Sequence, residues 1–254
     1  MKHRTLRLEG PLHVTENTSS GEPVSGFCGR GISRRGILRR TLSLAVLGTV
    51  GASFDLHRPG TFARTDLSSA QALEELLAGN RRFVEGNMRH CAEDLDILRQ
   101  HTAEKQEPFA AVLSCADSRV PVELIFDQSI GHIFVTRVAG NVATAEMIAS
   151  LEYGAAVLGT KVILVLGHSN CGAVKAAMAG KDVPGQISSL YLPLRPSIDE
   201  AGTNSAAAAQ ANARIQARLL GKCSTVISGL MVANKISVAA AYYDVSTGIV
   251  SMLA

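Results

Sequence analysis

Two short, continuously apolar runs stand out in the hydrophobic pattern of this chain. Phe109–Ser114 and Val162–Gly167 each carry aliphatic or β-branched side chains without a charged interruption. Runs of this kind are typical of strands that are covered on both faces, as in a parallel sheet. Ile130–Arg137 fits a third strand, and Ile236–Leu253 is expected to form a strand, a turn around Gly248 and a second strand.

Helical periodicity fills the stretches between these strands. Residues 68–87 repeat apolar side chains at spacings of three and four, which predicts an amphipathic helix capped by Ser68 or Ser69. Further helices are expected over residues 120–126, 143–158, from Ala173 onward, and over 206–220. The glycines and prolines of residues 180–196 predict a loop.

The alternation of strands and helices predicts an α/β fold. We expect a mainly parallel central β-sheet flanked by helices, with an antiparallel C-terminal edge and an N-terminal helical arm. That arm is expected to pack either on a neighbouring subunit or on its own sheet. Residues 1–65 are interpreted as a leader, an export signal with a linker, and residues 66–254 as the folded domain.

Metal-ligating residues follow two of the predicted strands. Cys115 comes directly after the first apolar run, and His168 and Cys171 come directly after the second. Because ligands gather at the carboxyl ends of parallel strands, the three side chains are expected to converge. Two thiolates and one imidazole form a set that zinc prefers, and three protein ligands leave one coordination position for water, as in a catalytic site.

Asp117 and Arg119 lie two positions apart immediately after Cys115. They can form a charge-assisted pair, which elsewhere would be an ordinary loop salt bridge. Beside a metal the pair gains a function, because Arg119 keeps Asp117 ionised and able to accept a hydrogen bond from an activated water molecule.

Four motifs together resemble those of the β-class carbonic anhydrases. They are, in chain order, Cys115-Ala-Asp-Ser-Arg119, Arg137-Val-Ala-Gly-Asn141, Ser150-Leu-Glu-Tyr153 and Gly167-His-Ser-Asn-Cys-Gly172. The resemblance extends over about residues 70–253. It implies a zinc-dependent lyase, with one Zn²⁺ per subunit, that hydrates carbon dioxide reversibly to bicarbonate and a proton.

The resemblance also carries expectations for assembly and for two further roles. It implies a homodimer or a tetramer. It implies that Gln106, just ahead of the first strand, orients the substrate. In some family members the residue at Asp117 turns onto the zinc as a fourth ligand and closes the site.

Two other functions share these residues. The same fold can hydrolyse a carbon dioxide analogue such as carbon disulfide, and a zinc-stabilised module need not be catalytic at all. The intact Asp117–Arg119 pair argues against the second alternative.

Composition and charge limit the kinds of molecule that the protein is expected to bind. With 46% hydrophobic residues the 254-residue chain can bury a substantial core. Residues 1–40 hold eight Lys and Arg against three Asp and Glu, which leaves 17 basic and 19 acidic residues in the remainder. The basic excess therefore belongs to the leader, and neither charge nor motif indicates a nucleic-acid partner.

The leader itself has an interpretable pattern. Arg34 and Arg35 precede the weakly apolar run Thr41–Phe54, an arrangement that resembles a twin-arginine export signal, although Ile37 and Arg39 depart from the usual motif. We expect export to a periplasmic or lumenal compartment, with transient membrane contact through the leader. The alternatives are an amphipathic surface anchor, or a basic tail on a cytoplasmic protein.

Five cysteines in a chain of this length do not indicate a disulfide framework. Cys28 would leave with the leader. Cys91 and Cys223 are expected to be buried thiols, or a disulfide pair formed after export.

Overall fold

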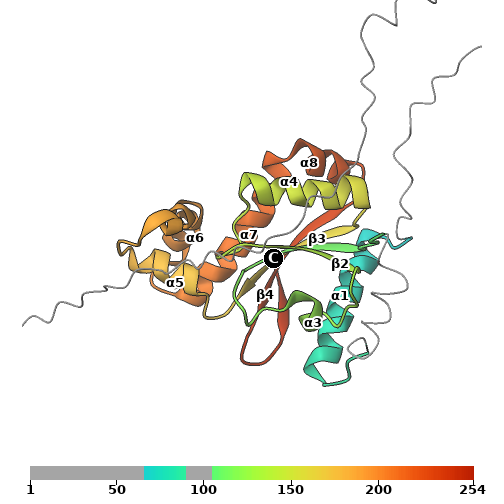
Figure 1. Cartoon of the computed structure of the whole chain (residues 1–254), viewed down its shortest axis with the longest axis horizontal. Helices are drawn as coiled ribbons and strands as arrows, with labels where there is room; N and C mark the ends of the chain where they lie inside the picture. Colours follow the sequence, from blue (N-terminus) through green and yellow to red (C-terminus); the bar gives the residue numbers. More distant parts are fainter. Residues whose placement is uncertain (1–65, 90–104) are drawn as a thin grey trace, which may run out of the picture. The chain divides into compact units, whose positions relative to one another are not determined.

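A five-stranded sheet in the order β2-β1-β3-β4-β5 runs through residues 66–89 and 105–254, the part of the chain that the computed structural model describes (Figure 1). Four strands are parallel neighbours: β1 (Ala110–Ser114), β2 (Ile133–Arg137), β3 (Val162–His168) and β4 (Ser237–Tyr243). The fifth, β5 (Val250–Leu253), pairs antiparallel with β4 at the edge. The predicted sheet and its antiparallel C-terminal edge are confirmed, whereas the expectations for residues 1–65 and for Cys91 lie outside the described residues.

The register of the central pair sets where these strands end. Ala110 of β1 lies beside Val162 of β3, and Ser114 lies beside Leu166. The residue that follows β1 and the last residues of β3 therefore emerge at the same edge of the sheet. Both strands are fully buried, as their continuous apolar runs predict.

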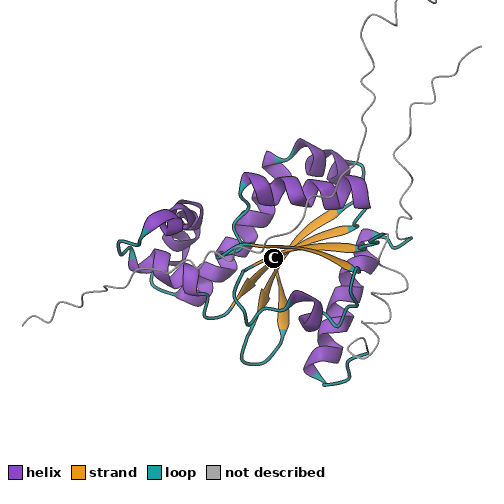
Figure 2. Ribbon diagram, viewed as in Figure 1, coloured by secondary structure: helices purple, strands orange, loops and turns teal. Residues whose placement is uncertain are grey.

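Helices cover both faces of the sheet (Figure 2). The helices α1 (Ser69–Val84) and α3 (Val122–Ile125) pack on the face formed by Val112, Leu164 and Leu166. On the opposite face α4 (Ala145–Tyr153), α7 (Ser205–Cys223) and α8 (Thr225–Val232) pack against Leu113, Ile163 and Val165. Alternate residues of the same two strands thus fill two separate cores, because successive side chains of a strand point to opposite faces.

A third apolar cluster lies beyond the carboxyl ends of the strands. It joins α5 (Gly172–Ala179) and α6 (Tyr191–Ala201) to the first half of α7, through Val174, Leu194 and Ala208. Cys115 and Cys171 belong to this cluster. It encloses the sheet edge at which the predicted metal ligands emerge.

The loop predicted for residues 180–196 forms only over residues 180–184, and the prediction is wrong for the rest. Gly185–Leu190 form a 3₁₀-helix, η2, and α6 begins at Tyr191 despite Pro193 and Pro196. Pro193 lies in the first turn, where a backbone N–H has no helical acceptor to lose, and only Pro196 removes a hydrogen bond. The complete burial of Leu194 against α5 and α7 stabilises the helix against that loss.

The helix expected over residues 143–158 forms in two parts. The regular helix α4 ends at Tyr153, and the chain continues as a π-helix, η1 (Gly154–Leu158). Gly154 lies against the ring of Phe134, where an added Cβ would come within 3.1 Å of Cδ1. The π-helix, whose turns are wider than those of an α-helix, begins at this close contact.

The N-terminal helix α1 packs on its own sheet, which is one of the two alternatives. Ser68 caps it and shares a capping box with Gln71, as predicted. The buried amide of Asn80 donates to the carbonyls of Ile125 and Gly248 and accepts the N–H of Val250. Contact of α1 with a second copy stays a prediction.

None of the helices within residues 66–89 and 105–254 is both long enough and hydrophobic enough to cross a membrane.

A buried ion pair also fixes α1, and it can be tested by substitution. Arg82 donates to the fully buried carboxylate of Asp127, which also accepts the N–H of Arg89. We expect Asp127→Ala to lower the free energy of unfolding by about 3 kcal/mol, because it leaves a largely buried guanidinium with only its longer ion-pair contact to Glu75. Urea unfolding followed by circular dichroism measures this change, and a loss below about 1 kcal/mol would show that the ion pair adds little to the attachment of α1.

Candidate metal centre

Cys115, His168 and Cys171 lie together at the carboxyl ends of β1 and β3. One ligand atom from each residue falls within 4.8 Å of the other two, and all three side chains are buried. Cys115 follows β1, His168 is the last residue of β3, and Cys171 immediately precedes α5. The structure thus brings together the three residues that the sequence selects as ligands.

The orientation of the His168 ring leaves one nitrogen for a metal. Nδ1 lies 2.9 Å from the carbonyl oxygen of Ser169, and since a carbonyl only accepts, Nδ1 carries the proton. Nε2 is buried and has no hydrogen-bond partner within the described residues. A buried lone pair with no donor beside two sulfur atoms fits a zinc ion.

Close packing of α7 on β3 supports this arrangement. A Cβ on Gly167 would lie 2.9 Å from the carbonyl oxygen of Ala209 and 3.3 Å from the Cβ of Ala213. Only glycine permits the helix to approach the strand so closely, directly before His168.

The two thiols form a coupled pair. Hydrogen bonding from the Cys171 thiol, with a weaker contribution from the Gly140 N–H, outweighs burial and lowers the pKa of Cys115 to about 4. The same partnership with Cys115, together with burial, raises the pKa of Cys171. Without a metal the pair therefore shares one proton between two sulfurs.

Asp117 is held beside the cluster by Arg119. The guanidinium donates from Nε to Oδ1 at 2.9 Å and from Nη2 to Oδ2 at 2.8 Å, and the Arg119 backbone N–H adds a third bond at 3.0 Å. These donors hold the pKa of the Asp117 carboxyl well below its usual range. Its Oδ2 lies 3.9 Å from Nε2 of His168, so an ionised acceptor faces the ligand group without belonging to it.

Arg137 fixes the loop that carries both Cys115 and Asp117. From the end of β2 its Nε donates to the Cys115 carbonyl at 2.9 Å, and its Nη2 donates to the Asp117 carbonyl. The sequence marks Arg137 as part of a motif but gives no role for it. The available signal was an arginine at the end of the strand that borders β1.

Gln106 lies elsewhere in the same chain. It is exposed and precedes the amino end of β1, whereas the cysteines and His168 lie at the carboxyl end. The four steps along β1 alone span about 13 Å. The structure does not bring Gln106 to the site of its own chain, and its role in substrate binding stays a prediction.

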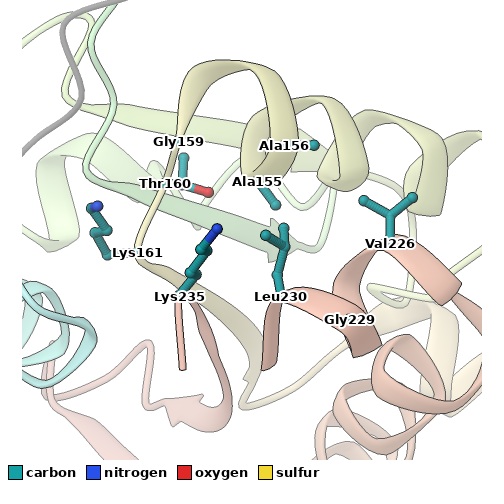
Figure 3. A pocket seen from close by; sticks show the side chains of 9 residues that line it. All are labelled: Ala155, Ala156, Gly159, Thr160, Lys161, Val226, Gly229, Leu230 and Lys235. Atoms are coloured by element: carbon teal, nitrogen blue, oxygen red, sulfur yellow. The ribbon is translucent and has the colours of Figure 1, made fainter. Parts of the chain in front are cut away.

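A cavity of about 430 Å³ lies at the other end of the sheet, before β3 and β4 (Figure 3). Residues of η1 and α8 line it together with Lys161 and Lys235. None of the predicted site residues contributes to its walls, so the largely buried ligand cluster is a separate feature.

The expectation that Cys223 is buried is wrong, because this thiol is exposed at the end of α7. Cys28 and Cys91 lie outside the described residues.

Comparison with known proteins identifies relatives of this arrangement. The family model described as carbonic anhydrase matches residues 110–250. Carbonic anhydrase 2 of Mycobacterium tuberculosis is 46% identical over 108 residues, which are 42% of this chain and 52% of that protein. The chain thus spans about half the length of the curated relatives it matches.

Solved structures extend the comparison to the whole domain. The β-carbonic anhydrase of Coccomyxa, in complex with acetazolamide, is 28% identical with a TM-score of 0.58, covering 71% of this chain and 86% of that one. A tetrameric β-carbonic anhydrase of Sordaria macrospora shares the fold at 22% identity and a TM-score of 0.58, covering 72% of this chain and 97% of that one.

The coupled thiols give a pH-dependent prediction for the metal-free protein. In Cys171→Ala the pKa of Cys115 should rise from about 4 toward its ordinary value, because its strongest hydrogen-bond donor is removed. At about pH 6 the ultraviolet thiolate absorbance, taken as a difference from Cys115→Ala, should be present in the wild type and lost in Cys171→Ala. An unchanged titration would show that Cys171 does not stabilise the thiolate.

Proposed function

Because this chain belongs to the β-class carbonic anhydrase family, we propose that it catalyses the reversible hydration of carbon dioxide to bicarbonate and a proton, with one zinc ion per subunit. The observation that carries the proposal is the convergence of Cys115, His168 and Cys171 beside the ion pair of Asp117 and Arg119. The donor set supports zinc, and the ion pair supports catalysis rather than a structural role.

Zinc held by these ligands would act as a Lewis acid that lowers the pKa of a coordinated water toward neutrality. Asp117 accepts a hydrogen bond from the attacking water and turns its lone pair toward the carbon of carbon dioxide. Arg119 keeps Asp117 ionised, and Arg137 holds the backbone on both sides of Ala116. Asp117 thus orients the attacking water, and Arg119 and Arg137 hold Asp117 and its loop in place for this role.

We place Asp117 outside the metal's ligands in the resting protein. Three hydrogen bonds from Arg119 hold its carboxylate, and turning it onto the metal would break them. The geometry therefore supports an open site rather than one closed by Asp117.

The relatives favour carbon dioxide over carbon disulfide as the substrate, because the matched proteins are named carbonic anhydrases. The intact ion pair of Asp117 and Arg119 likewise disfavours a module that only binds zinc.

Assembly into a homodimer or tetramer is part of the proposal. The Sordaria macrospora relative is tetrameric, and Gln106 lies at the wrong end of β1 to serve its own site. We therefore assign Gln106 to the substrate site of a neighbouring copy.

A stopped-flow assay of carbon dioxide hydration tests the function. The zinc-loaded full-length chain should hydrate carbon dioxide, and Cys171→Ser should lose both zinc and turnover because one of three ligands is replaced by a poor one. A zinc-loaded wild type without hydration would refute the proposal, and carbon disulfide supplied to the same protein would then test the alternative substrate.

In the same assay Asp117→Asn should retain zinc and lose turnover by about 100-fold, because the amide can donate to the water where the carboxylate only accepts. Asp199→Asn is the matched control, since Asp199 forms an exposed ion pair with Arg195 on α6. Full activity in Asp117→Asn would remove Asp117 from the mechanism.

We also propose export through the twin-arginine signal at Arg34 and Arg35. Replacing both by lysine conserves charge and should leave the protein in the cytoplasm, as measured by cell fractionation and by sequencing the mature N-terminus. The control replaces Arg4 and Arg7 by lysine. Unchanged distribution of the Arg34 and Arg35 variant would contradict export by this signal.

A further inference from the structure

The backbone N–H of Gly140 is a direct partner of one metal ligand. It donates to the Cys115 sulfur at 3.3 Å, in a buried position. Gly140 has a φ of 79° and Asn141 a φ of 42°, so two consecutive residues adopt the left-handed conformation. A non-glycine residue there is strained, and such a turn persists only where its surroundings hold it.

Two amides on α7 hold this turn at both ends. Asn212 Nδ2 donates to the Gly140 carbonyl at 2.8 Å, and Gln216 Oε1 accepts the N–H of Ala143 at 2.9 Å. Gln216 Nε2 donates to Asn212 Oδ1 at 3.0 Å, which joins the two. Both side chains are almost completely buried.

The ends of this chain of hydrogen bonds determine every amide orientation. The Ala143 N–H can only donate and the Gly140 carbonyl can only accept. Gln216 must therefore turn its oxygen to Ala143 and its nitrogen to Asn212, whose nitrogen then faces Gly140. Flipping either amide would bring two donors or two acceptors face to face, so the arrangement has one stable form.

We propose that Asn212 and Gln216 are positioning residues that hold the Gly140 N–H on the Cys115 sulfur and thereby strengthen zinc binding. The inference rests on the proposed function, because it assigns Cys115 to zinc. Neither amide is hydrogen-bonded to a ligand atom; both act through residues 140–143. Partners of metal ligands tune affinity in this way, typically by about 10-fold to 100-fold.

The domain offers a matched control. Asn80 is also a buried asparagine with three hydrogen bonds, but it joins α1 to the end of α3, to the turn before β5 and to β5 on the other face of the sheet. Asn212 also donates to the side-chain oxygen of Asn141 at 3.3 Å. Asn212→Ala and Asn80→Ala therefore each remove one buried amide with three hydrogen bonds, so both should lower the unfolding midpoint. Only Asn212→Ala should affect the metal.

The test measures zinc affinity by chelator competition and the thiolate-to-cobalt charge-transfer band of the Co²⁺-loaded full-length protein. We expect Asn212→Ala to bind zinc about 10-fold more weakly with a shifted cobalt band, and Asn80→Ala to match the wild type in both. Should Asn212→Ala fail to fold, Gln216→Leu removes the hydrogen bonds to Ala143 and to Asn212 at similar volume and should weaken zinc binding in the same direction.

Wild-type affinity and an unshifted cobalt band in Asn212→Ala, or an equal loss in Asn80→Ala, would overturn the proposal. A failure of the proposed function would appear in a different measurement. A wild type that binds the metal but does not hydrate carbon dioxide would refute the reaction and leave this comparison of metal affinities valid.

Discussion

The parallel pairing of β1 with β3 is the constraint on which the site depends. Ser114 lies level with Leu166, so Cys115 and His168 leave the sheet at the same edge, and the turn to α5 brings Cys171 back to them. A slip of one residue would turn His168 to the other face of the sheet. The continuous burial of both strands, each packed on two faces, fixes the register and with it the distance between the ligands.

Around this edge, charged and polar groups fix the loop and the turn beside the ligands, which apolar packing alone does not position. Arg137 holds the loop of Cys115 and Asp117 through two carbonyls, Arg119 keeps Asp117 ionised, and the amides of α7 hold the turn at Gly140. A buried polar group is costly unless it is paired, so such networks specify one arrangement when they are complete. The preorganised donor set is what a catalytic metal needs.

Much of this could be predicted from the sequence, because local pattern and local chemistry coincide. The apolar runs predicted β1 and β3, and the metal-ligating residues that follow these runs predicted the cluster of Cys115, His168 and Cys171. The prediction failed where contacts between distant residues decide. The helix α6 forms through the burial of Leu194, and the roles of Arg137 and Asn212 depend on partners about 20 and 72 residues away. The exposure of Cys223 likewise follows from packing that its local sequence does not reveal.

X-ray absorption at the zinc edge of the loaded, full-length protein tests most directly whether two thiolates and one imidazole share a single ion. We predict two sulfur atoms at about 2.3 Å and one imidazole nitrogen at about 2.0 Å, with one further light atom completing the shell. A wild-type shell without sulfur, or one with four sulfur atoms, would contradict the account.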